Sequence, residues 1–425
     1  MRIMGKNIVL NRANLYDVFL SWLCAIIGFL SIRPYFVWNT YLNGALDIFR
    51  IIILGGTFLI LLFNLIVTSG KLKINKLIIG LALLLVYLYQ RSVQGVFNFA
   101  IGSIITIGII FLFINLKEIQ KKDVYLKFKT IFALSLISGV VVWFITTIGF
   151  DIPYSRLMTE HVGKSSLGIY YKNYFGSIFM DSVYDIFLLK RMCGMFDEPG
   201  VIGTYSALIL IVENFKIKGK WQNTLILIAG ILSFSLAFWI MSVTFYILRS
   251  FKKGTINIII SIIVMVLAYL IFLNINTENL YILGLQQRLA FSNGFFMGDN
   301  RTESSFDVAY NLFLEGKDGS RIFGNGLNAA ANNLNMFGSY SYKMLIYDYG
   351  FLGFAMIIIW LIFSVTLLYK RNWECIILLL IFLLSIYQRP YIIEISYMIV
   401  LFGGCSYLNN KSINNKVFKI KTNLN

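Results

Sequence analysis

The chain has few of the residues on which metal sites, disulfide frameworks and soluble surfaces depend. It contains one histidine, His161, four cysteines with no C-x-x-C spacing, and four prolines among 425 residues. These counts exclude His-rich metal chemistry and give no support to a zinc site or a disulfide framework. Only 13% of the residues are charged and 58% are hydrophobic. This composition is typical of a membrane protein.

The charges that are present are mostly basic, with 37 Lys and Arg against 20 Asp and Glu and a net charge of +17. In a soluble protein such a balance often indicates a nucleic-acid partner. Here it accompanies apolar runs of about 20 residues, the length that crosses a bilayer. Membrane topology therefore explains the charge, and no nucleic-acid partner is expected.

Apolar runs of membrane-spanning length recur along the whole chain. They lie near residues 15–32, 48–68, 77–90, 96–116, 130–150, 199–214, 222–248, 256–274, 344–369, 374–388 and 391–408. The run 222–248 is long: its 27 residues reach roughly 40 Å as a helix against a hydrocarbon core of about 30 Å. Length alone permits either one tilted span or a hairpin.

Flanking charge decides between these alternatives, because basic residues precede the run at 216–220 and follow it at 249–253. A single crossing would place one basic cluster outside, whereas a hairpin that turns near Ser233 to Ser235 keeps both inside. The sequence therefore predicts an all-α, polytopic membrane helix bundle with about 12 transmembrane segments. Residues 1–425 would form a single integral membrane domain with both termini cytoplasmic.

The two sides of this predicted topology differ in their type of cation. The cytoplasmic side carries 23 basic residues, of which 19 are lysine, against five acidic ones. The remaining residues, which are external or lie within spans near the external side, comprise 14 basic ones, of which nine are arginine, and 15 acidic ones. Lysine suffices to orient a membrane protein, whereas the planar guanidinium suits bidentate capture of phosphate. Pairing of the external arginines with the external acids is the alternative.

Two external segments are long, 151–198 and 275–343, and long loops often carry the function of a membrane scaffold. The spacing of apolar residues in the second loop predicts two short amphipathic helices, one near 279–291 and one beginning at Ser304 or Ser305. The first loop is rich in aromatic residues, namely Tyr170, Tyr171, Tyr174 and Phe175. These rings are suited to stacking on sugars or to an interfacial aromatic belt. His161 in the same loop is a candidate base, although a lone loop histidine is more often incidental.

The stretch RMCGMFDEPG, residues 191–200, combines a cation, two adjacent carboxylates and a proline that can begin the next helix. Arg191 beside a helix N-terminus is suited to an anionic diphosphate. Asp197 or Glu198 is suited to take a proton from an acceptor hydroxyl. The alternative is an ordinary N-terminal cap whose acids complement the helix dipole and pair with Arg191.

The stretch DGSRIFGNGLN, residues 318–328, places Arg321 before Gly324 and Gly326. Backbone amides in such a turn can approach phosphate oxygens, although a simple loop turn is the more common outcome. The chain has no P-loop, no G-x-S-x-G and no H-E-x-x-H motif. An external enzyme without a nucleotide site needs an activated substrate that is already in the membrane.

These features resemble the Wzy-type O-antigen and capsular polysaccharide polymerases, within the superfamily that also holds the O-antigen ligases. The likeness covers the many-span layout with two large external loops and the element R-x-x-G-x-F-x-E-P, realised as Arg191, Gly194, Phe196, Glu198 and Pro199. It extends to FGNGL at 323–327 and to LIYDYGFLGFAMIIIW at 345–360, in which an acid precedes G-x-x-G.

The resemblance implies a metal-independent glycosyltransferase, without a cofactor, on the external face of a bacterial cytoplasmic membrane. It would transfer a growing glycan from undecaprenyl diphosphate to the non-reducing end of a lipid-linked repeat unit, with a flippase and a chain-length regulator as expected partners. Glu198 is the preferred base and Asp197 the second candidate. The candidates for holding diphosphate are Arg191, Arg288, Arg301 and Arg321, with Arg191 and Arg321 first because they lie in the matching motifs.

Two alternatives stay open. The ligase branch carries a histidine in the second large loop, and this loop has none, which favours a polymerase over a ligase. A flippase for lipid-linked oligosaccharides can also have about 12 spans. Transporters tend to place ionisable groups at mid-membrane, and here Arg50 and Glu394 are the two candidates for such groups.

Overall fold

The computed structural model describes most of the chain. The described residues are 2–38, 43–69, 73–93, 101–158, 168–183, 190–292, 295–296, 304–316, 320–330, 341–370, 372–387, 389–390 and 392–410. His161 and Arg301 therefore lie outside the described residues. The first half of this part holds α1 (Arg2–Ser31), α2 (Tyr35–Trp38), α3 (Asn43–Ser69), α4 (Ile74–Ser92), α5 (Ile101–Asn115), α6 (Glu118–Thr147) and α8 (Pro199–Val212). The second half holds α9 (Trp221–Leu232), α10 (Leu236–Ser250), α11 (Thr255–Leu273), α12 (Leu280–Leu289), α13 (Ser304–Glu315), α14 (Ser320–Phe323), α16 (Tyr342–Tyr369), α17 (Trp373–Ile386) and α18 (Ile395–Met398).

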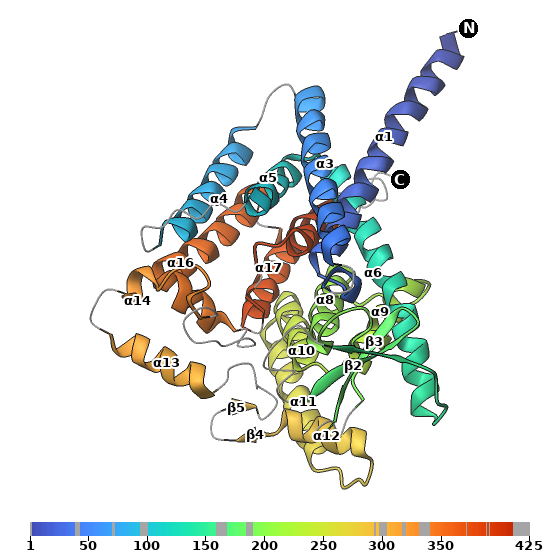
Figure 1. Ribbon diagram of the computed structural model, residues 1–425, viewed down its shortest axis with the longest axis vertical. Coiled ribbons are helices and arrows are strands. Elements are labelled where there is room, and N and C mark those ends of the chain that lie inside the picture. Colours follow the sequence, from blue (N-terminus) through green and yellow to red (C-terminus); the bar gives the residue numbers. More distant parts are fainter. Residues whose placement is uncertain are drawn as a thin grey trace.

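The protein is mostly helical and its helices are those of a membrane protein. Within the described part, four helices are long and apolar enough to cross a bilayer: α4, α6, α11 and α16. Shorter apolar helices accompany them, among them α8, α9, α10 and α17. Figure 1 shows the first turns of α1 at the top of the molecule, and the strands of the first loop with α12 and α13 toward the bottom.

Helix α8 lies at the centre, and all 14 of its residues are buried. Its sequence is apolar on every face, as expected for a helix with no exposed side. Helices α9 and α10 both pack against it. Gly203 permits this approach, because a Cβ atom at that position would lie 2.2 Å from the Cβ atom of Ser235.

The hairpin predicted at Ser233 to Ser235 is confirmed. Helix α9 ends at Leu232 and α10 begins at Leu236, with Phe234 between them at a φ of 45°. Asn223, at the start of α9, contacts Glu213 at the end of α8, and Phe245, near the end of α10, packs against Phe215, which follows α8. The chain thus runs along α8 and returns along it, and the two arms have 12 and 15 residues.

The first large loop differs from the all-α prediction because it contains a small antiparallel sheet. Strands β1 (Ser155–Met158), β2 (Ile169–Tyr174) and β3 (Ser177–Ser182) pair in the order β1-β2-β3. Along β2, Ile169 and Tyr171 are buried and Tyr170 between them is only partly buried, whereas Tyr174, on the opposite face of the strand, is buried as well. The alternation of period two is therefore limited to residues 169–172, which is too short a signal to predict the strand from the sequence. Short strands β4 (Phe291–Ser292) and β5 (Phe295–Phe296) also pair in the second loop.

The two amphipathic helices predicted in the second loop are present as α12 and α13. The FGNGL turn that follows α14 packs on the start of α16, where Gly350 breaks the helix with φ 69° and ψ 175°. Gly324 and Gly350 lie back to back, since a Cβ atom on Gly324 would lie 2.5 Å from Gly350 N. Both residues have positive φ, so glycine is required at this crossing.

The ion pairs between described residues fall into two groups. Glu118 with Lys121, Glu213 with Lys129 and Lys220, and Glu374 with Lys252 join residues that the sequence assigns to the cytoplasmic side. Glu198 with Arg389, Asp181 with Lys172, and Asp307 with Lys343 join residues that it assigns to the external side. In each of these pairs, both residues belong to the same predicted side of the membrane.

Candidate functional site

The segment 190–198 lies between four parts of the molecule before α8 begins. Tyr35 N donates to Met195 O at 2.6 Å, and Ile178 N of β3 donates to Gly194 O at 2.6 Å. Phe196 is fully buried, with its ring 6.0 Å from Phe29 and 5.9 Å from Phe132. These contacts fix the backbone that presents Asp197 and Glu198.

Glu198 precedes α8 with an extended backbone, and Pro199 takes the first helical position. Its side chain does not bond the amides of the first turn. Instead its Oε2 accepts a hydrogen bond from Arg389 at 2.7 Å. An ordinary N-terminal cap, the alternative interpretation of this motif, is therefore not what the structure shows for Glu198.

Arg389 reaches Glu198 from the turn between α17 and α18, 191 residues along the chain. Its side chain is 9% exposed, whereas that of Glu198 is 18% exposed. A charge-assisted bond in such a place is short and strong, because little water competes for the two groups. The pair joins the start of α8 to the turn that precedes α18.

Glu394 adds a second carboxylate from the same turn. Burial disfavours the charge of this carboxylate, the arginines Arg33 and Arg389 favour it, and Asp197 opposes it. Arg33 follows the end of α1 with φ 59°. We refer to Arg33, Asp197, Glu198, Arg389 and Glu394 as the Glu198 cluster.

The Glu198 cluster adjoins an open space. A cavity of about 200 Å³ is lined by Arg33 and Glu394, with Ser31, Leu54 and Thr106 among the other residues. We refer to it as the Glu394 cavity. One carboxylate and one guanidinium, those of Glu394 and Arg33, thus line a space that can admit part of a ligand.

Arg191 and Asp197 are held in the same segment by other bonds. Arg191 Nε donates to Ser233 O at 3.1 Å, so the guanidinium contacts the turn between α9 and α10. Tyr171 of β2 donates from its hydroxyl to Asp197 O at 2.7 Å. The sheet and the hairpin therefore both support the backbone around Glu198.

Lys190, next to Arg191 in the first loop, is a cation whose pKa is sensitive to its surroundings. Burial lowers the pKa of its ammonium, and Lys172 lowers that pKa further, while Asp181 and Asp151 oppose the change. A guanidinium keeps its charge in such surroundings because its intrinsic pKa is far higher. Arginine is therefore the more dependable cation on this side of α8.

The second predicted motif lies elsewhere. Figure 1 shows α14 beside α16, well apart from α8. Arg321 on α14 is exposed and donates to Leu314 O at the end of α13. The structure therefore does not bring Arg321 together with Glu198. Arg288 lies on α12, and its side chain is outside the described residues.

The glycine turn bonds to the chain itself. Gly324 N donates to Ser320 O at 2.6 Å, and Gly326 N donates to Asp348 O at 2.9 Å. Asp348, the acid before Gly350, accepts from Ala330 N at 3.0 Å through its side chain. These bonds tie the FGNGL turn to Asp348, so both motifs stabilise the same turn. Phosphate binding by Gly324 and Gly326 stays a prediction.

Arg33, Arg389 and Glu394 are the site residues that sequence reasoning did not select. Arg33 and Arg389 were two among nine external arginines, and Glu394 was assigned to a span. The available signal was local: each lies where an apolar run meets a turn, and Arg389 precedes Pro390. In the described residues, no group of three or more His, Cys, Asp or Glu residues is placed to hold a metal ion.

Comparison of the chain with protein-family models, with curated proteins and with solved structures finds no match.

Proposed function

We propose that the protein is a Wzy-type polysaccharide polymerase of a bacterial cytoplasmic membrane. It would transfer a growing glycan from undecaprenyl diphosphate to the non-reducing end of a lipid-linked repeat unit on the external face. One observation carries the proposal. The Glu198 to Arg389 pair lies in a cluster of acids and arginines beside the Glu394 cavity, at one end of the buried helix α8.

The reaction forms one bond and breaks another. The acceptor hydroxyl oxygen attacks the anomeric carbon of the donor glycan, and the bond from that carbon to the phosphate oxygen breaks. Glu198 takes the proton of the acceptor hydroxyl, with Asp197 or Glu394 as the neighbouring carboxylate. Undecaprenyl diphosphate leaves with the electron pair, and fixed guanidinium groups stabilise its charge in a site with little water.

Arg33 and Arg389 are the arginines best placed for this role, because both act on the carboxylates of the Glu198 cluster. Arg191 belongs to the same segment and remains a candidate. Arg321 and Arg288 lie on α14 and α12, and binding of a more distant part of the glycan by these residues stays a prediction.

The proposed orientation has about 12 membrane segments, both termini cytoplasmic, and the Glu198 cluster external. The division of the ion pairs into two groups supports it. A reporter fused after Asn410 should be active only in the cytoplasm. A reporter that is active outside would contradict this orientation.

The function is tested in cells that lack the gene for this protein. Loss of a polymerase leaves single repeat units on the surface, and the wild-type chain should restore a ladder of long glycans on electrophoresis. A deletion strain that displays no repeat units at all would indicate a flippase and would contradict the proposal.

A further inference from the structure

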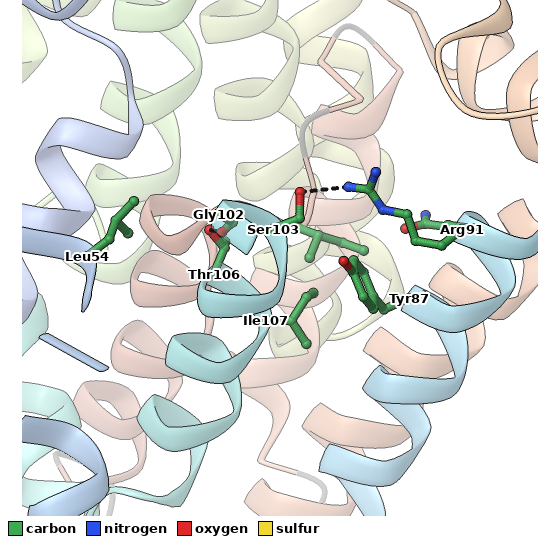
Figure 2. Close-up of a pocket in the computed structure, with 9 residues that line it drawn as sticks. Leu54, Tyr87, Arg91, Gly102, Ser103, Thr106 and Ile107 are labelled. Atoms are coloured by element: carbon green, nitrogen blue, oxygen red, sulfur yellow. Dashed lines mark hydrogen bonds between the residues drawn. The ribbon is translucent and has the colours of Figure 1, made fainter. Parts of the chain in front are cut away.

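A second cavity, of about 420 Å³, lies between α3, α4 and α5. Figure 2 shows Arg91 and Tyr87 of α4 on one side, Ser103 and Thr106 of α5 across from them, and Leu54 beyond. We refer to this space as the Arg91 cavity. Its volume lies within the range of about 300 to 1,000 Å³ that is common for ligand sites, and no residue of the Glu198 cluster lines it.

The cation of this cavity is held in one orientation. Arg91 Nη2 donates a hydrogen bond to the Ser103 hydroxyl at 2.7 Å. The guanidinium carbon lies 5.3 Å from the centroid of the Tyr87 ring, a cation–π distance. A guanidinium fixed by two neighbours loses little conformational freedom when it binds an anion.

The wall across from Arg91 leaves room for a ligand. A Cβ atom added to Gly102 would meet nothing within 4 Å. Gly102 and Ser103 of α5 both line the cavity. The geometry therefore suits an anionic group between Arg91 and this part of α5.

The surroundings of the cavity are apolar. Leu84 and Leu85 of α4 and Ile101 and Ile104 of α5 are exposed on the helices that form its walls. On membrane helices such side chains face lipid tails. A ligand with an anionic head and a long apolar chain fits this combination better than a free anion does.

The Arg91 cavity adjoins the Glu394 cavity. Leu54 and Thr106 line both spaces. Ile393 lines the Arg91 cavity and the next residue, Glu394, lines the Glu394 cavity, so the two cavities are neighbours at this point of the chain. A ligand whose head group lies at Arg91 can therefore extend past Thr106 toward Arg33, Glu394 and Glu198.

We propose that the Arg91 cavity binds the diphosphate of one of the two lipid-linked glycans, with the attached sugar directed toward Glu198. A polymerase needs two such substrates at once, and the Arg91 cavity provides a second anion site apart from Arg389. This inference rests on the proposed function, because it names a substrate of the same reaction.

The test measures binding of undecaprenyl diphosphate, without a sugar, to the purified full-length protein in lipid nanodiscs, by native mass spectrometry. The wild-type protein should bind two molecules, one in the Arg91 cavity and one at the arginines of the Glu198 cluster. Arg91→Gln should weaken binding of one of the two about tenfold, because it removes a charged hydrogen-bond donor. Gly102→Leu should abolish binding of that molecule by filling the Arg91 cavity, so that a single bound lipid remains. Gly55→Leu on α3 is the matched control: its Cβ position also meets nothing within 4 Å, and Gly55 lines neither cavity.

Wild-type affinity in both Arg91→Gln and Gly102→Leu would overturn the assignment, and Gly102→Leu alone decides if Arg91→Gln does not fold. Phosphatidylglycerol forms a second arm. If it binds as tightly and Arg91→Gln weakens both ligands equally, the cavity takes phospholipid head groups in general and the proposal is wrong. Because no sugar is transferred here, this result is separate from that of the polymerisation test on Glu198.

Discussion

Helix α8 has a carboxylate at each end, and the two are enclosed differently. Glu213 follows the helix and is fully buried. It accepts hydrogen bonds from Lys129 at 2.7 Å, from Lys220 and from Tyr407 at 3.2 Å, and we refer to these four residues as the Glu213 cluster. Glu198 precedes the helix, keeps 18% of its side chain exposed and lies in a cluster that borders a cavity.

The difference separates a structural carboxylate from one that can react. A carboxylate surrounded by two ammonium groups and a hydroxyl is stabilised in its charged form and is closed to a substrate. A carboxylate that takes a proton from a substrate hydroxyl must lie within hydrogen-bond reach of it. Four variants test this contrast, ranked by the expected loss of polymer per folded molecule.

Glu198→Gln should have the largest effect, a loss of about a hundredfold or more, because general base catalysis contributes a factor of that order. The amide oxygen can still accept from Arg389, so the protein should fold. Polymer length is measured by electrophoresis and the amount of membrane protein by immunoblot. Long glycan at wild-type yield would remove Glu198 from the mechanism.

Arg191→Lys should lose most of the polymer, by about tenfold, because a point charge does not replace the planar guanidinium that bonds Ser233 O. Arg249→Lys is the matched control. Arg249 stacks over Phe245 near the Glu213 end of α8, where positive charge alone is expected to suffice. Equal losses in the two variants would show that the preference for arginine near Glu198 has no functional meaning.

Gly350→Ala should reduce polymer a few fold, because its Cβ atom would lie 2.1 Å from Ile322 O at a φ of 69°. Backbone strain of this kind costs about 1 to 3 kcal/mol and would shift the FGNGL turn. Gly56→Ala, a position on α3 with open space around its Cβ, is the control. A yield in Gly350→Ala equal to that of Gly56→Ala would leave the second loop without influence on the reaction.

Glu213→Gln should leave polymer per folded molecule unchanged and lower stability instead. Removing one partner of a buried ion pair costs about 3 to 5 kcal/mol, because Lys129 keeps a buried charge without its counterion. The measurements are the thermal midpoint of the purified protein and the polymer yield per folded molecule. A variant with wild-type stability and no polymer would invert the roles assigned to the two ends of α8.

The sequence predicted the elements whose signal is local. Basic residues on both sides of one long apolar run were enough to predict the hairpin at Ser233 to Ser235, and helical spacing was enough to predict α12 and α13. The sheet was missed because its tyrosines also fit an interfacial belt. The partner of Glu198 was missed because Arg389 is 191 residues away, and charge pairing over that separation leaves no local pattern.

The most direct test uses purified protein in vesicles, supplied with a repeat unit on undecaprenyl diphosphate and no nucleotide. The wild-type chain should produce a ladder of longer glycans and release undecaprenyl diphosphate, whereas Glu198→Gln should produce neither. The account is contradicted if the wild-type protein forms no ladder, or if Glu198→Gln forms one at the wild-type rate.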